Sequence, residues 1–177
     1  MADFEKAITI LLRDEGGYAP DDNGRGAVNL GVTQATLDAH WAKEPQTCKA
    51  LALPKRVEEF KPGDAARFYR AFFWDRLYLA SVNDDQVAGI LFALAVNQGP
   101  SWPVLYAREA LEAVGIKAGT ARQVMVALNS IAQIDAILGI YNWAIARYHR
   151  LAEKDPARYG DDVKGWELRL RRLCGIE

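Results

Sequence analysis

The sequence predicts a mainly α-helical domain with one small β element after the first helix. Apolar residues recur every three or four positions along most of the chain, which is the period of a helix with one buried face. One short stretch, residues 28–32, alternates apolar residues with small or polar ones, as a strand does. With 177 residues, half of them hydrophobic, the chain can bury a substantial core without disulfides.

The first helix is expected from Asp3 to Asp14. Its large apolar residues fall on one stripe, which consists of Phe4, Ile8, Leu11 and Leu12. Between Gly16 and Gly26 the chain is rich in Gly, Pro, Asp and Asn, so it turns there. The predicted strand follows at residues 28–32, and Thr33 can then cap a second helix that ends at His40 or Ala42.

Helical periodicity resumes after a loop that contains Pro45 and Pro54. The expected helices cover residues 63–78, 83–97, 103–114, 120–129, 131–152 and 162–173. Asn83 is the expected cap of the second of these, and Ser130 with Gln133 forms a capping-box pattern before the long one. The apolar stripe of the long helix consists of Ile134, Leu138, Tyr141, Ile145, Tyr148 and Leu151.

Composition and charge exclude several classes of protein. The net charge of −1 gives no electrostatic footprint for nucleic acid, and Arg169, Arg171 and Arg172 are interpreted as a solvated helix face. The longest apolar run, residues 87–96, is too short to span a bilayer, so no stable membrane insertion is expected. The N-terminus lacks the basic residues of a signal peptide, and we expect the protein to be made in the cytoplasm.

Glu15 is out of place at the end of the first helix. At about 100° per residue it falls close to Phe4 and Ile8, on the apolar stripe. Burial and the negative end of the helix both disfavour the carboxylate and raise its pKa, which lets a carboxyl group donate a proton near neutral pH. The structural alternative is that Glu15 turns outward and pairs with a cation such as Arg13 or Arg25.

The turn after Glu15 adds groups that suit the cleavage of a glycosidic bond. Tyr18 offers a flat apolar face with a hydroxyl tip for a sugar, and Asp22, or less readily Asp21, can supply a second carboxylate. A calcium loop is excluded, because Arg25 falls where a ligand should be. No metal and no cofactor are expected.

The stretch "DEGGY", followed by "DDNGRGAVNLGVTQATL", resembles the N-terminal signature of glycoside hydrolase family 108. The similarity extends to "AARFYRAFFWDRLY", "LFALAVNQGP" and "KGWELRLRRL". This family contains N-acetylmuramidases of phage lysis cassettes and bacterial genomes. The resemblance implies a lysozyme-like α+β fold in one compact domain, residues 1–177, with a catalytic part at 1–100 and a helical part at 101–177 that resembles a peptidoglycan-binding region.

The resemblance also implies roles for individual residues. Glu15 corresponds to the proposed catalytic acid of the family, and Asn29 and Thr33 correspond to residues that line the cleft. Asn97 corresponds to a residue expected to face the same cleft from a core helix, whereas Trp74 is interpreted as a packing residue.

The expected function is that of a muramidase that cleaves the β-1,4 bond between N-acetylmuramic acid and N-acetylglucosamine in peptidoglycan glycan strands. A lytic transglycosylase remains an alternative. So does an inactive wall-binding or structural protein, because Ala93 stands where relatives often carry aspartate and Arg25 interrupts a glycine pair. Another expectation is action on the cell wall, in the periplasm, after release through a holin pore or a secretion system.

Overall fold

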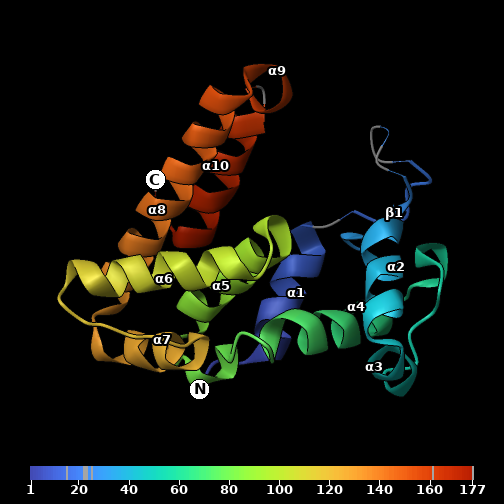
Figure 1. Ribbon diagram of the computed structural model, residues 1–177, viewed down its shortest axis with the longest axis horizontal. Helices are drawn as coiled ribbons and strands as arrows, with labels where there is room; N and C mark the ends of the chain where they lie inside the picture. The colour runs from blue at the N-terminus through green and yellow to red at the C-terminus, as the bar shows by residue number, and fades with distance from the viewer. Residues whose placement is uncertain (15, 22–23, 25, 161, 177) are drawn as a thin grey trace. The chain divides into compact units, whose positions relative to one another are not determined.

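A computed structural model of the chain describes residues 1–14, 16–21, 24, 26–160 and 162–176 (Figure 1). The internal contacts divide the chain into two compact units. One consists of Phe4–Trp74 and is called the hairpin unit; the other consists of Met1–Asp3 with Asp75–Glu177 and is called the helical unit. The single domain with a boundary after residue 100 stays a prediction.

The hairpin unit combines helices with a two-stranded antiparallel sheet. Its elements are α1 (Phe4–Asp14), β1 (Val28–Asn29), β2 (Val32–Thr33), α2 (Gln34–Lys43), α3 (Pro45–Ala50), η1 (Val57–Glu59), α4 (Pro62–Tyr69) and the π-helical turn η2 (Arg70–Trp74). The stripe of α1 is buried as predicted at Phe4, Ile8 and Leu11. The predicted loop around Pro45 is wrong, because Pro45 occupies the first turn of α3, where a missing N–H costs nothing.

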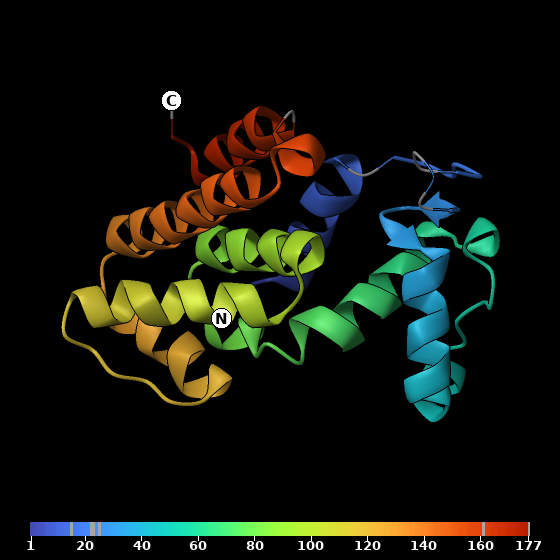
Figure 2. The same cartoon turned by 45° about the horizontal axis from the view of Figure 1, so that its top comes forward.

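The β element is a tight hairpin and not the single strand predicted from alternation (Figure 2). Val28 pairs with Thr33 and Asn29 with Val32, so only Leu30 and Gly31 form the turn. Both turn residues have positive φ, 51° and 77°, as in a type I′ turn, whose backbone twist matches that of the strands. Gly31 adopts this conformation freely, whereas Leu30 is strained in it.

Leu30→Asn is expected to stabilise the protein by about 0.5–1 kcal/mol, because asparagine tolerates positive φ and Asn-Gly is the preferred pair in such turns. The measurement is the free energy of unfolding in guanidinium chloride. Leu168→Asn is the matched control, since Leu168 is an exposed leucine in a regular helix. If Leu30→Asn lowered the free energy of unfolding as much as Leu168→Asn does, the claim that Leu30 is strained would be contradicted.

The helical unit is built around α5 (Asp85–Gln98), whose residues from Val87 to Ala95 are mostly buried on every side. The other elements are η3 (Leu79–Ser81), α6 (Ser101–Ala113), α7 (Ala121–Ala127), η4 (Leu128–Ser130), α8 (Gln133–Lys154), α9 (Pro156–Tyr159) and α10 (Asp162–Cys174). Helices α6, α8 and α10 all contact α5. Among the described residues, no helix is both long enough and apolar enough to cross a membrane.

Two predicted helix caps in this unit are wrong. The cap of α5 is Asp84, whose carboxylate accepts from Val87 N–H (2.8 Å), whereas Asn83 accepts from the N-terminal amine of Met1. The Ser130 hydroxyl donates to the Ala127 carbonyl and ends η4, so it does not cap α8. In both cases the side chain named by the local pattern forms its hydrogen bond with another polar group of the same unit.

The stripe of large apolar residues on α8 is only partly buried. Ile134 is 57% exposed and Leu138 is 40% exposed. The buried face of α8 consists of Ala136, Ile137, Ile140, Ala144 and Tyr148, so Tyr148 is the one residue of the predicted stripe that is buried. Small residues form much of this face, and the backbone of α6 approaches it closely at Gly139.

Gly139→Ala is expected to destabilise the protein by about 1–2 kcal/mol through overpacking. A Cβ at Gly139 would lie 2.5 Å from the Ala110 Cβ, so α6 and α8 would have to move apart. Gly89→Ala in α5 is the matched control: it meets no atom within 4 Å and should stabilise by about 0.5–1 kcal/mol through helix propensity. Equal changes in melting temperature for the two variants would contradict this packing.

Candidate active site

The segment that follows α1 is attached to the hairpin. The Leu30 N–H donates to the Gly16 carbonyl (3.2 Å), and Ala19 forms an antiparallel bridge with Val28 through two hydrogen bonds of 2.9 Å. Glu15, the predicted catalytic acid, and Asp22, the predicted second carboxylate, lie outside the described residues. Tyr18 lies within the attached segment and is 47% exposed, so its ring offers surface to a ligand.

Asn29, predicted to line the cleft, is buried in β1 at 6% exposure. Its Nδ2 donates to the carbonyls of Val57 (2.8 Å) and Phe60 (3.2 Å). These two bonds use both amide hydrogens and fasten the hairpin to η1. Asn29 therefore holds the hairpin against η1, and its contact with substrate stays a prediction.

Thr33 caps α2 as the sequence predicted. Its hydroxyl accepts from Thr36 N–H (3.1 Å) and also shares a hydrogen bond of 2.8 Å with the Thr36 hydroxyl. Because the cap fixes where α2 begins, it also fixes the end of β2, which pairs with β1. The role of Thr33 in lining a cleft stays a prediction.

Two residues that support the hairpin were not identified from the sequence. The Tyr69 hydroxyl donates to the carbonyl of the strained Leu30 (3.0 Å). The Gln34 side chain accepts from Val57 N–H (2.9 Å) and donates to the Lys55 carbonyl (2.8 Å). No local sequence pattern marks either residue, because the partners lie 21 to 39 positions away.

Asp21 anchors the turn that precedes β1. Its two carboxylate oxygens accept from Gly24 N–H (3.1 Å) and Gly26 N–H (3.0 Å). Both glycines have positive φ, which other residues adopt only with strain. With each oxygen occupied by a backbone amide, Asp21 is a loop anchor, which leaves Asp22 as the candidate for the second carboxylate.

The remaining predicted residues lie at the end of α5 and the end of η2. Asn97 is an exposed residue of the helical unit, and its Oδ1 accepts from Arg169 Nη1 (3.1 Å). Its position facing the cleft stays a prediction. Trp74 is buried and packs edge-on against Phe4, with 5.5 Å between ring centroids, which confirms its packing role.

The described residues of the two units do not support a metal site or a reactive thiol. Among the described residues, no three His, Cys, Asp or Glu side chains are grouped so that they could hold a metal ion. Cys48 and Cys174 are buried free thiols. Burial raises the pKa of Cys174 to about 12 and also raises that of Cys48, so neither forms a thiolate nucleophile at neutral pH.

Comparison with known proteins fits this architecture. SagA of Brucella abortus has a similar solved structure, with a TM-score of 0.71 and 23% sequence identity over 97% of this chain and 91% of that chain. This similarity confirms the predicted mainly α, lysozyme-like α+β fold. No curated protein matches the chain. The family model for glycosyl hydrolase 108 matches residues 8–99, more than half of the chain, and the chain therefore belongs to this family of glycoside hydrolases, for which a glycan is the class of substrate.

Proposed function

We propose that the protein is an N-acetylmuramidase that cleaves the β-1,4 bond between N-acetylmuramic acid and N-acetylglucosamine in peptidoglycan. The observation that carries this proposal is the family match over residues 8–99, a range that contains Glu15, the attached segment and the hairpin. The burial of Phe4, Ile8 and Leu11 adds support, because Glu15 continues their stripe in the sequence.

In the proposed reaction, Glu15 protonates the leaving glycosidic oxygen while positive charge develops on the sugar ring. Asp22 stabilises that charge or activates water. Tyr18 provides an exposed aromatic ring against which a sugar can pack. The hydrogen bonds of Asn29, Thr33 and Tyr69 hold the surrounding backbone in place.

Turbidity clearance of outer-membrane-permeabilised Gram-negative cells tests the proposal. The protein is expected to clear the suspension and to release soluble fragments from purified sacculi. An inactive wall-binding protein would instead pellet with sacculi and release nothing. Such a result would favour the alternative of an inactive wall-binding protein. That alternative is suggested by Ala93, which is buried in α5 where relatives often carry a carboxylate.

Asp22→Asn is expected to lower the rate of glycan cleavage about 100-fold or more, whereas Asp21→Asn should retain most activity. The difference arises because an asparagine at position 21 keeps one oxygen acceptor for the loop, while an asparagine at position 22 removes the proposed second charge. The measurement is the release of reducing sugar ends from sacculi by each variant at equal concentration. The reverse order of the two effects would assign the second carboxylate to Asp21.

The partner of the proposed reaction is the glycan strand of the cell wall. Release to the wall through a holin pore or a secretion system is part of the proposal and rests on the family resemblance alone.

A further inference from the structure

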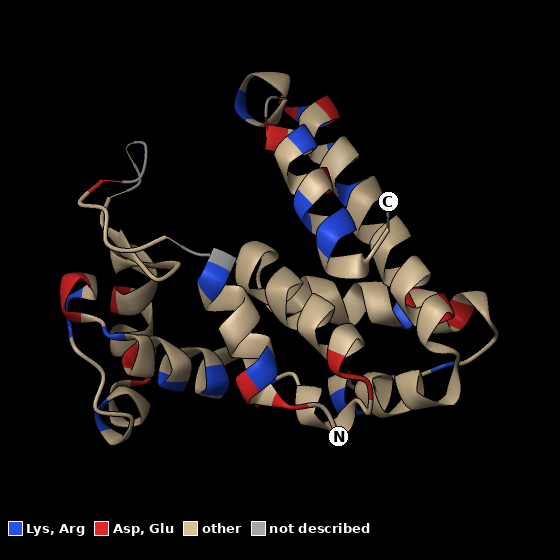
Figure 3. Ribbon diagram, turned by 180° about the vertical axis from the view of Figure 1, so that it is seen from behind, with Lys and Arg blue, Asp and Glu red and all other residues tan. Residues whose placement is uncertain are grey.

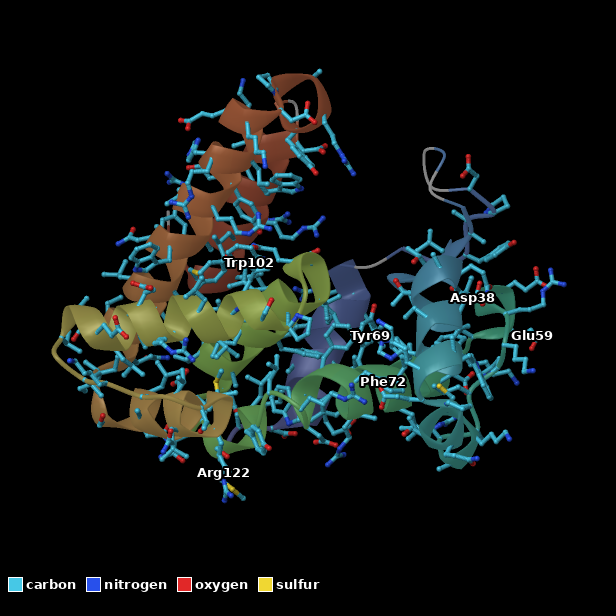
Figure 4. All side chains as sticks on the ribbon, in the orientation of Figure 1. Asp38, Glu59, Tyr69, Phe72, Trp102 and Arg122 are labelled. Carbon is cyan, nitrogen blue, oxygen red and sulfur yellow. The ribbon has the colours of Figure 1, made fainter. Side chains whose placement is uncertain are left out.

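Polar and aromatic side chains from four helices gather in the helical unit, at the end of α5. Gln98 comes from α5, Trp102 from the first turn of α6 (Figure 4), Arg147 and Tyr148 from α8, and Arg169 from α10. These five residues are called the Arg147 cluster. They span 71 positions of sequence, and none of them has a role in the proposed hydrolysis.

The two arginines of the cluster have no acidic partner among the described residues. The Arg147 guanidinium stacks on the Trp102 ring at 3.8 Å, and its Nε is buried without a hydrogen-bond partner. Arg169 donates to the neutral Asn97 amide (3.1 Å). In the part of the chain that the structure describes, no carboxylate lies within ion-pair distance of either arginine. Figure 3 shows the further Lys and Arg residues along α10.

Tyr148 and Gln98, neutral groups of the cluster, also carry hydrogen-bond donors. Burial raises the pKa of Tyr148, and the nearby Gln98 amide and the two guanidinium groups only partly offset this effect, so the phenol stays protonated. Gln98 Oε1 accepts from the Tyr106 hydroxyl, and the Gln98 side chain also lies within hydrogen-bond reach of the Tyr148 hydroxyl. Arg147 Nε is a buried donor without an acceptor, and such a donor is costly.

A carboxylate fits these donors best. Stacking on Trp102 fixes the plane of the Arg147 guanidinium, whose edge can then form two parallel hydrogen bonds with a planar anion. Within the proposed substrate, the sugar hydroxyls and acetamido groups are neutral. The lactyl carboxyl of muramic acid is amide-bonded to the stem peptide, so free carboxylates are found on the peptide.

We propose that the Arg147 cluster binds a carboxylate of the peptidoglycan stem peptide. This inference rests on the proposed function, since it assumes the cell wall as the substrate. It adds a second point of recognition, directed at the peptide and not at the glycan.

Isothermal titration calorimetry of the full-length protein tests the inference. The probes are the disaccharide–tetrapeptide monomer, which lacks the bond to be cleaved, and the same disaccharide with its lactyl carboxyl capped as a primary amide in place of the peptide. The peptide-bearing probe is expected to bind about tenfold more tightly or better, and Arg147→Gln or Arg169→Gln should each remove most of this difference. Arg122→Gln, an exposed arginine of α7 labelled in Figure 4, is the matched control and should change nothing.

Equal affinity for the two probes would overturn the inference. Displacement of the peptide-bearing probe by inorganic phosphate at a similar concentration would also overturn it, because the cluster would then be a phosphate site. Arg169 is exposed, so its variant keeps the test valid if the Arg147 variant unfolds. Cleavage of peptide-free glycan strands is measured separately, so that lost cleavage with intact peptide binding counts against the proposed function alone, and the reverse result counts against the inference alone.

Discussion

Glu15→Gln is expected to lower the rate of glycan-strand cleavage by about 10²–10⁴-fold, the usual contribution of a general acid. Glutamine has nearly the same shape as glutamate but carries no proton that it can transfer to the leaving oxygen. Because only the chemical step is affected, binding of the glycan and the circular dichroism spectrum should be unchanged. The measurement is the initial rate of muropeptide release from purified sacculi, with binding followed separately by pelleting.

Glu5→Gln provides the matched control for this prediction. Glu5 is a glutamate of the same helix, α1, and its side chain is 74% exposed. Its replacement should leave the rate within a factor of about two, as for most surface substitutions away from a site. A Glu15→Gln variant that keeps more than a tenth of the wild-type rate would move the proton donor to another residue.

Asn29→Ala is expected to lower the free energy of unfolding by about 2–4 kcal/mol, since two buried carbonyls each lose a hydrogen bond and one of them, at Phe60, keeps no other described donor. Those carbonyls belong to Val57 and Phe60, and they lose bonds of 2.8 and 3.2 Å. Asn29→Asp should be at least as harmful, because a carboxylate keeps the size of the side chain but faces the same carbonyls without hydrogens. Chemical denaturation followed by circular dichroism measures both variants.

Asn142→Ala on the exposed surface of α8 is the control and should change stability by less than about 0.5 kcal/mol. An Asn29→Ala protein of wild-type stability with weakened glycan binding would instead make Asn29 a substrate contact, as the family resemblance implies. The two results separate the architectural role seen in the structure from the binding role expected from the motif.

Elements governed by local chemistry could be predicted from the sequence. The stripe of α1 and the Thr33 cap both depend on residues within a few positions of one another, and both are confirmed. The hairpin was missed because Leu30 imitates the alternation of a strand. Its positive φ is maintained by Tyr69 and Gly16, which no local pattern connects to the turn.

The packing of α8 could not be predicted from the sequence pattern of that helix alone. A search for large apolar residues selects Ile134 and Leu138, which the structure leaves substantially exposed. The contact with α6 depends on the absence of a side chain at Gly139, next to Ala110. Such close helix contacts are set by the partner helix, so periodicity within one helix does not reveal them.

The candidate site was predictable where a contiguous motif carries it and not elsewhere. The stretch from Glu15 to Thr33 led to the family that the comparison confirms. By contrast, Arg169 was interpreted as part of a solvated face, and its proximity to Tyr148 depends on how α8 and α10 pack. Sites assembled from distant helices require the tertiary structure.

The most direct test of the proposed activity is mass spectrometry of the fragments released from purified peptidoglycan in oxygen-18 water. A muramidase must place one heavy oxygen at a reducing end that is N-acetylmuramic acid, and Glu15→Gln must suppress this product. Anhydromuramic ends without heavy oxygen would identify a lytic transglycosylase, and reducing ends on N-acetylglucosamine would identify cleavage of the other glycosidic bond. Either of these two results would contradict the proposed reaction.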